Sequence, residues 1–377
     1  MKRLGWLAAT VVLLIVVTLV WVGVRFSGGE PYPAVVTEPR YPAQALEKVL
    51  EYPEPLGNLA VDDQGRVYFT VHPESRPSGH KVLVWDGEAF APFPDAARQD
   101  SLFQTPLGMV IDRQGRVWTI DHGFHGLGDP RLLAFDPRTG EVVHDHRFSG
   151  AVAPMGSFLQ DLQVSPNGDT VYIADVGLLR GVPGLVVYDV VSGTARRVLD
   201  GHPSVMPQDW LIRTPSREMK FLGGLFVLKP GVDGLALSRD GRWLFYGAMT
   251  HDTLYRVPTA ALRAADLAAE QLDGAVQPLV PKPLNDGMSI DNAGNVYLTD
   301  VEHQGVYVIS PAGDHHTLVQ HPDIRWADAL SFGPDNMLYI LDSAIPEQML
   351  RSKAHMAAQG PYAIYRLQLP VGAPAGQ

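Results

Sequence analysis

The chain has 377 residues, of which 46% are hydrophobic and 19% charged, enough apolar material for a large core. Its net charge of −11 argues against nucleic acid as a partner, because phosphate binding needs a basic patch. The sequence contains no cysteine, which excludes disulfides, thiolate metal sites and a cysteine nucleophile.

The N-terminal segment is apolar. Residues 4–24 carry no charge and follow Lys2 and Arg3, which favour a cytoplasmic N-terminus. We predict that residues 1–25 form an uncleaved signal anchor, with a cleaved signal peptide as the alternative, because no convincing small-residue cleavage site follows. The remaining chain is then expected outside the cytoplasm, periplasmic and anchored to the inner membrane, or secreted if the helix is cleaved. This helix is the only part expected to contact a membrane.

A strand–turn–strand motif recurs after a proline- and glycine-rich segment, residues 26–45, that predicts a polar tether. Six copies of the motif lie within residues 46–370. Each pairs an apolar strand with a polar turn and a second strand, and the copies start near Asn58, Gly108, Asp161, Asp233, Asp286 and Asp328. A third strand follows each copy, at 82–85, 132–135, 185–188, 253–257, 306–309 and 363–367.

The repeat predicts the fold. A four-stranded antiparallel unit written six times, roughly every 40–50 residues or more, is typical of a β-propeller. We therefore predict an all-β, six-bladed propeller of four-stranded antiparallel blades, preceded by one transmembrane or signal helix. The strand at 47–52 is expected to complete the sixth blade and so remove an open sheet edge. Residues 371–377 are left as a C-terminal tail.

Two segments depart from the regular repeat. Residues 202–230, between the third and fourth copies, contain Trp210, Phe221 and Phe226, and predict a packed loop over one face of the propeller. Residues 258–272 begin with proline and are rich in alanine, which predicts a helix between strands.

The starts of the inner strands and the ends of the second strands should meet around one mouth of the central channel, because these strands are antiparallel. The second strands end at His72, Asp121 with His122, Asp175, Asp300 and Asp342. We expect the aspartates among them to be structural, accepting backbone N–H groups of the loops that follow.

The inner-strand starts are the candidate site. Carboxylates converging on a partly buried mouth must raise their pKa values, find donors or bind a cation. Because Ca²⁺ accepts six to eight oxygen ligands, we predict a divalent cation, Ca²⁺ by preference. Asp233 and Asp286 are also predicted to be catalytic, as ligand or general base. The predicted metal ligands are Asn58, Asp161, Asp233, Asp286 and Asp328.

Several stretches resemble the yellow/major royal jelly protein family over roughly residues 45–370: 158–162 (FLQDL), 233–238 (DGLALS), 254–258 (LYRVP) and 326–332 (WADALSF). The resemblance implies an exported six-bladed propeller related to regucalcin and gluconolactonase. In that wider group a divalent cation, usually Ca²⁺, is held at the channel mouth by Glu, Asn and Asp. Asp233 and Asp286 match two of these positions. Lactonases have Asn where Asp233 stands, and only Glu54 or Asn58 could supply the first-blade ligand.

Three functions follow from the site and the resemblance. The first is a metal-dependent, lactonase-like hydrolase acting on a small molecule at the channel mouth. The second is a non-catalytic protein that binds a small amine or aromatic ligand in an acidic channel. The third is a tautomerase of the dopachrome-converting type, which needs a base but not a metal. Motifs of serine hydrolases, nucleotide-binding loops and zinc proteases are absent.

Overall fold

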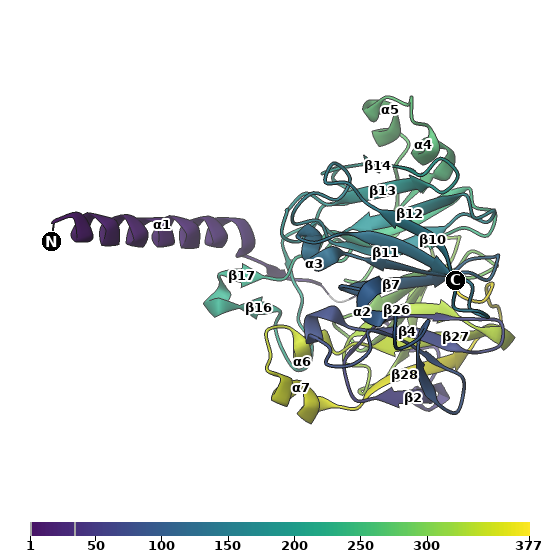
Figure 1. The fold of residues 1–377 in the computed structure, drawn as a ribbon. Coiled ribbons are helices and arrows are strands. Elements are labelled where there is room, and N and C mark those ends of the chain that lie inside the picture. Colours follow the sequence, from purple (N-terminus) through teal and green to yellow (C-terminus); the bar gives the residue numbers. More distant parts are fainter. Residues whose placement is uncertain (1, 34) are drawn as a thin grey trace.

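The structure is a computed structural model that describes residues 2–33 and 35–377. Met1 of the predicted anchor and Ala34 of the predicted tether lie outside the described residues. Six four-stranded antiparallel sheets form the blades of a propeller (Figure 1). This confirms the predicted all-β propeller of six four-stranded antiparallel blades.

The first three blades follow the chain without interruption, with the inner strand first in each. They comprise β3 (Leu56–Val61), β4 (Val67–Val71), β5 (Val82–Trp85) and β6 (Phe90–Pro92); β7 (Pro106–Ile111), β8 (Val117–Asp121), β9 (Arg131–Phe135) and β10 (Val142–Arg147); and β11 (Leu159–Val164), β12 (Thr170–Asp175), β13 (Gly184–Asp189) and β14 (Thr194–Val198).

The last three blades repeat this order, and the sixth takes its outer strand from the N-terminal side. They comprise β18 (Val232–Leu237), β19 (Trp243–Ala248), β20 (Thr253–Pro258) and β21 (Gln277–Pro281); β22 (Met288–Ile290), β23 (Val296–Asp300), β24 (Gly305–Ile309) and β25 (His315–Gln320); and β26 (Ala327–Phe332), β27 (Met337–Asp342), β28 (Tyr362–Gln368) and β2 (Glu47–Tyr52). The pairing of β2 with β28 closes the ring, as predicted.

Side chains from neighbouring blades form the core. Trp118 of blade 2 packs with Ile173 of blade 3, and Tyr172 of blade 3 packs with Leu235 of blade 4. All four side chains are at most 1% exposed. The alternation of each strand therefore serves two interfaces, one on each face of the blade.

The insertion between blades 3 and 4 packs over one end of the channel, as predicted. It contains β15 (Trp210–Leu211), β16 (Lys220–Phe221) and β17 (Phe226–Val227). Ile212 and Met219 are fully buried in a cluster with Trp326 and with Tyr32 of the predicted tether. The tether is itself docked, because β1 (Glu30–Pro31) pairs with β15.

The predicted helix at 258–272 is wrong as a single element. The structure has two short helices there, α4 (Thr259–Arg263) and α5 (Ala269–Asp273), with Ala264 in an extended conformation after the first. Leu262 and Leu272 both pack into the core between blades 3 and 4, and the chain bends so that each can reach it. The remaining short helices are α2 (Gln99–Leu102), α3 (Gly123–Gly126), α6 (Ile345–Gln348) and α7 (Lys353–Gln359).

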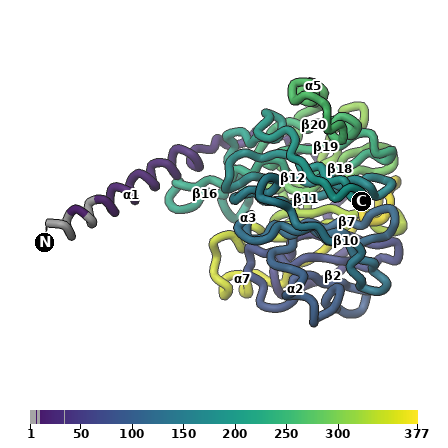
Figure 2. The backbone as a smooth tube through the Cα atoms, turned by 45° about the horizontal axis from the view of Figure 1, so that its top comes forward, coloured from purple at the N-terminus to yellow at the C-terminus, as the bar shows by residue number. Residues whose placement is uncertain are grey.

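Helix α1 (Lys2–Phe26) extends away from the propeller, on the side that carries β16 and α7 (Figure 2). Phe26 at its end contacts Phe226 of the insertion, with ring centroids 5.7 Å apart. Among the residues that the structure describes, no helix is long and apolar enough to cross a membrane. Membrane anchoring and export stay predictions.

The C-terminal tail closes the other end of the channel. The carbonyl oxygen of Gln377 accepts hydrogen bonds from the backbone of Phe332 (2.8 Å) and from the hydroxyl of Ser289 (3.1 Å). Its side-chain amide donates to Gln163 (3.2 Å). These partners belong to three inner strands, so the tail crosses the axis at the end of the channel opposite the insertion.

Candidate functional site

The inner-strand starts are displaced from regular strand geometry. In five of the six blades the register between the first two strands shifts at the first residues of the inner strand. The shifts bracket Asn58, Asp161, Asp233 and Asp328. A β-bulge interrupts the alternation of side chains and re-aims one of them. In these four blades the bulge thus directs a polar side chain toward the channel mouth, whereas in blade 2 it brackets only Leu107 and Gly108.

Glycine follows the acidic residue in two blades because neighbouring inner strands touch there. A Cβ atom on Gly234 would lie 2.5 Å from the carbonyl oxygen of Asp286, and one on Gly287 would lie 2.2 Å from that of Asp328. The backbone N–H of Gly287 also donates to the Asp328 carbonyl (2.7 Å). In each Asp-Gly pair, the aspartate side chain therefore points to the channel mouth, and the glycine allows the backbone to approach the inner strand of the next blade.

The predicted site residues converge in one cluster. The indole N–H of Trp326 donates to Asp286 Oδ2 (2.7 Å), and the Gln160 amide approaches Asp286 Oδ1 (3.4 Å). The Asn58 amide donates to Asp161 Oδ1 (3.1 Å). Neither carboxyl oxygen of Asp233 has a hydrogen bond of normal geometry among the described residues. Asp233 is nevertheless close enough to Asp286 for each to shift the pKa of the other.

The four carboxyl groups are difficult to ionise. Burial raises the pKa of Asp286 to about 7, against the lowering effect of the Trp326 hydrogen bond. Burial and then the charge of Asp286 raise the pKa of Asp161, the most accessible of the four, to about 8. The same two causes raise the pKa values of Asp233 and Asp328 well above their ordinary range. The cluster therefore retains protons near neutral pH, which its members share.

Three of the four carboxyl groups line a cavity of about 250 Å³. We define the floor of this cavity by Asp233, Asp286, Asp328 and Gln160, the polar residues from the inner-strand starts that line it. Its apolar wall comes from loops and short elements of several blades: Phe158, Val176, Leu178, Leu179, Phe226, Leu228, Pro230, Met249, Trp326, Ile345, Met349 and Leu350. His72, Glu74 and His125 complete the lining.

The cluster fits a hard cation in its chemistry but not in its present arrangement. Its donors are carboxylate and amide oxygens, and the unpartnered oxygens of Asp233 would gain most from a positive charge. Within residues 2–33 and 35–377, however, no three His, Asp or Glu side chains converge on a point that could hold a metal ion. The predicted metal ligation stays a prediction.

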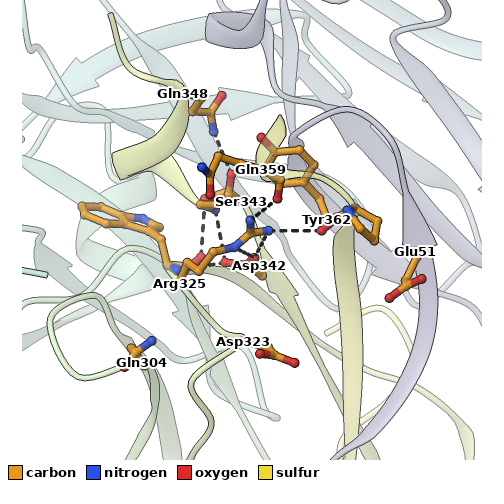
Figure 3. A network of polar contacts seen from close by, with 12 residues as sticks. Glu51, Gln304, Asp323, Arg325, Asp342, Ser343, Gln348, Gln359 and Tyr362 are labelled. Carbon is orange, nitrogen blue, oxygen red and sulfur yellow. Dashed lines mark hydrogen bonds and ion pairs between the residues drawn. The ribbon is translucent and has the colours of Figure 1, made fainter. Parts of the chain in front are cut away.

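The aspartates at the second-strand ends are structural braces, as predicted. In blade 6, Asp342 accepts from the backbone N–H groups of Trp326 (2.9 Å) and Ala344 (3.2 Å) and pairs with Arg325 (2.7 Å; Figure 3). Asp121, Asp175 and Asp300 accept backbone N–H groups in the same way. Each brace holds the loop that precedes an inner strand, the loop that follows the second strand, or both.

Sequence reasoning did not predict functional roles for Gln160, Trp326 or the His72, Glu74 and His125 group. Gln160 precedes Asp161, and Trp326 lies two residues before Asp328. Both could have been found by extending the inner-strand starts backward by one or two residues. Glu74 and His125 lie in loops after the second strands and carry no repeat signal.

Comparison with known proteins agrees with this architecture. The family model described as major royal jelly protein matches residues 104–356, and the chain belongs to this family. Major royal jelly protein 1 of Apis mellifera is 28% identical over 198 residues, which cover 48% of this chain and 43% of that protein. The match to Major royal jelly protein 2 of the same organism covers 39% of that protein's length. The chain thus matches less than half the length of these relatives.

Solved structures share the fold at low sequence identity. The calcium-binding protein regucalcin from Agrobacterium tumefaciens aligns with a TM-score of 0.57 at 15% identity, covering 90% of this chain and all of that one. A gluconolactonase from Xanthomonas campestris aligns with a TM-score of 0.55 at 17% identity, covering 91% and 98% of the two chains. These similarities show that the chain shares the propeller fold of these two proteins.

The glycine contact between blades 5 and 6 can be tested by substitution. Gly287→Ala forces a methyl group against the Asp328 carbonyl, and we expect a loss of about 1–3 kcal/mol in the free energy of unfolding. Gly150→Ala is the matched control, because no heavy atom lies within 4 Å of the position that its methyl group would take. Urea denaturation measures both. Equal stabilities of the two variants would contradict the close approach.

The buried carboxyls should make stability depend on pH. Asp328 has a raised pKa in the folded protein, so folded Asp328 keeps its proton where the unfolded chain, with an ordinary value of 3.8, has lost it. The contribution of Asp328 to stability is therefore fully present at low pH, below its ordinary value, and falls as the pH rises, by up to about 1.4 kcal/mol per pH unit for each such group.

We expect Asp328→Asn to reduce this slope between pH 5 and pH 8 in the presence of EDTA. Asp240→Asn is the control, because the pKa of the exposed Asp240, lowered to about 2, lies outside the window. Urea unfolding across the range gives both slopes. A slope unchanged by Asp328→Asn would contradict the raised pKa.

Proposed function

We propose that this protein is a lactonase-like hydrolase whose reaction takes place in the cavity above the carboxyl cluster. The observation that carries the proposal is the convergence of Asp233, Asp286 and Asp328 at the floor of one apolar-walled cavity. Three buried carboxyls without full hydrogen bonding are costly to the fold, as expected of a site retained for chemistry. The gluconolactonase-like architecture supports this reaction class by analogy.

Asp286 is the proposed general base. Trp326 holds one of its oxygens by a 2.7 Å hydrogen bond, which fixes the carboxyl plane and favours the ionised form. Its pKa of about 7 suits proton transfer at neutral pH. Asp286 takes a proton from water as the water oxygen bonds to the lactone carbonyl carbon. The ring C–O bond then breaks and the proton passes to the departing oxygen, which gives a hydroxy acid.

A divalent cation is a further part of this proposal. Asn58, Asp161, Asp233, Asp286 and Asp328 are the residues that would hold it, after side-chain movements that bring their oxygens together. When bound, such an ion polarises the substrate carbonyl and stabilises the carboxylates as anions. Without the ion, Asp233 retains its proton, and Asp286 is the carboxyl group that ionises near neutral pH.

A second function is favoured by the same cavity. An acidic floor beneath apolar and aromatic walls suits a small molecule with a cationic end and an apolar body, such as an aromatic amine. Phe158 and Trp326 supply aromatic wall surface, and the carboxyls supply the counter-charge. A tautomerase would use Asp286 as its base without a cation.

Removal of the base gives the sharpest test of the hydrolase. We expect Asp286→Asn to lower kcat for lactone hydrolysis by about 10²–10⁴-fold with little change in KM, because the amide cannot accept the proton of water. Asp63→Asn, on an exposed turn, is the control.

Equal activity of Asp286→Asn and wild type would reject the proposed base. If wild-type protein turns over no lactone but is stabilised by aromatic amines in a thermal-shift assay, the binding function is supported instead.

Cation dependence is tested on EDTA-treated protein. We expect millimolar Ca²⁺ to raise Tm by several degrees, because a ligand that binds only the folded state stabilises it by mass action. Asp233→Asn should abolish this rise, since it removes the carboxylate whose oxygens have no other partner among the described residues. Mg²⁺ serves as the control ion. A Tm indifferent to Ca²⁺, together with activity unchanged by EDTA, would remove the cation from the proposal.

A further inference from the structure

His72 presents a free N–H group to the cavity. Its ring lies at the end of β4, is 5% exposed, and forms part of the cavity lining. The backbone N–H of Glu74 donates to Nδ1 of His72 (3.2 Å), so Nδ1 carries no proton. In a neutral ring the proton must then be on Nε2. Nε2 has no hydrogen-bond partner among the described residues, which leaves it available to a ligand.

His122, behind the lining, has the same tautomer. Its Nδ1 accepts from the backbone N–H of His125 (3.0 Å), and its buried Nε2 has no partner in the described part of the chain. Burial lowers the pKa of His72 to about 4 and that of His122 well below its ordinary value. Both rings therefore remain neutral near pH 7, and a neutral imidazole donates from Nε2 without carrying a charge.

The third histidine of this wall is already engaged. His125 Nε2 lies 2.8 Å from Glu74 Oε1, and this contact is the main reason that the pKa of Glu74 lies below its ordinary value. His125 and Phe124 are consecutive non-glycine residues with φ values of 57° and 51°. Such strained backbone clusters at functional sites. The strained turn packs His125 against His122 and Phe158, with ring centroids 4.8 and 4.6 Å apart.

The cavity therefore has two chemically different polar groups within an apolar wall. The carboxyl groups of the floor include the proposed base Asp286, and a neutral N–H donor, His72, is part of the same lining. A carbonyl compound matches this pair, because its oxygen accepts a hydrogen bond while its carbon is attacked by water. A sugar lactone would leave several hydroxyl groups without partners against Leu228, Met249 and Ile345, at a cost for each.

We propose that His72 donates from Nε2 to the carbonyl oxygen of a lactone that carries an apolar substituent. As water adds, the C=O electron pair moves onto this oxygen, and the hydrogen bond strengthens with the developing negative charge. His72 keeps its proton throughout, so the proton balance of the hydrolysis still rests on Asp286. The catalytic role of His72 rests on the proposed hydrolase function. Its hydrogen bond to a carbonyl ligand, in contrast, can be tested without turnover.

Two substitutions separate the donor from the local structural role of His72. Asn at position 72 keeps an acceptor for the Glu74 N–H but lacks a donor at the Nε2 position. Gln reaches that position with its amide N–H but does not place an acceptor at Nδ1. We expect His72→Asn to lower kcat/KM for a hexyl-substituted δ-lactone by about 10²–10³-fold with Tm near that of wild type. His72→Gln should recover part of the rate despite a lower Tm.

His315→Asn, at the exposed start of β25, is the control for both. Full activity of His72→Asn would overturn the inference. The inference would also be overturned if the two variants lost kcat/KM in proportion to their loss in Tm, because this would indicate a structural role only. Wild type should also prefer the hexyl lactone to gluconolactone by at least tenfold in kcat/KM, and the reverse preference would overturn the substrate class.

Binding is measured with a hexyl-substituted δ-lactam, which has the carbonyl but resists hydrolysis. In protein labelled with ¹⁵N-histidine at pH 7, we expect the His72 signal, assigned by its loss in His72→Gln, to report a proton on Nε2. The lactam should shift this signal, and the cyclic ether of the same size should not. A proton on Nδ1, a cationic ring or no shift would overturn the contact.

These outcomes distinguish the two proposals. If the lactam shifts His72 but no lactone is hydrolysed, the carbonyl contact stands and the hydrolase fails. If lactones are hydrolysed while the lactam leaves His72 unchanged, the hydrolase stands and the inference fails.

Discussion

The constraint on which the site depends is the desolvation of four carboxyl groups at one end of the channel. Burial is the largest cause of the raised pKa in Asp161, Asp233, Asp286 and Asp328 alike. Few donors offset it, chiefly the indole of Trp326 and the amide of Asn58. The packing of the blades, rather than contacts within the cluster, therefore holds these carboxyl groups together. Their raised pKa values make proton transfer or cation binding at this point favourable.

Aspartate has two opposite roles in this propeller because of where each blade places it. At the second-strand ends, Asp175 and Asp342 accept two backbone N–H groups and pair with arginine. At the inner-strand starts, the bulge directs Asp233 away from such donors, and its oxygens have no partner in the described residues. The first arrangement braces the frame, whereas the second leaves a reactive group. The loops held by the braces also carry the wall of the cavity.

Much of this arrangement could be predicted from local patterns. The six hairpins, their third strands and the closure of the ring by β2 follow from alternation and turn chemistry repeated along the chain. The convergence of Asp233, Asp286 and Asp328 follows from antiparallel strands sharing one end. Helix length at 258–272 was not predictable in this way, because the burial of Leu262 and Leu272 against neighbouring blades overrode the helical propensity of the alanines between them.

Strand alternation and turn residues define the repeat, and the repeat defines the fold and the end of the channel where polar side chains meet. The surroundings of these side chains, in contrast, depend on how the blades and their loops pack together. The wall of the cavity brings together Phe158, Phe226 and Met349 from segments far apart in the chain, and the proposed donor is His72, whose tautomer depends on one backbone contact. The physical reason is range: strand patterns record interactions between near neighbours, whereas desolvation, the loss of hydrogen-bond partners and the choice of imidazole tautomer depend on groups brought close only by the closed ring.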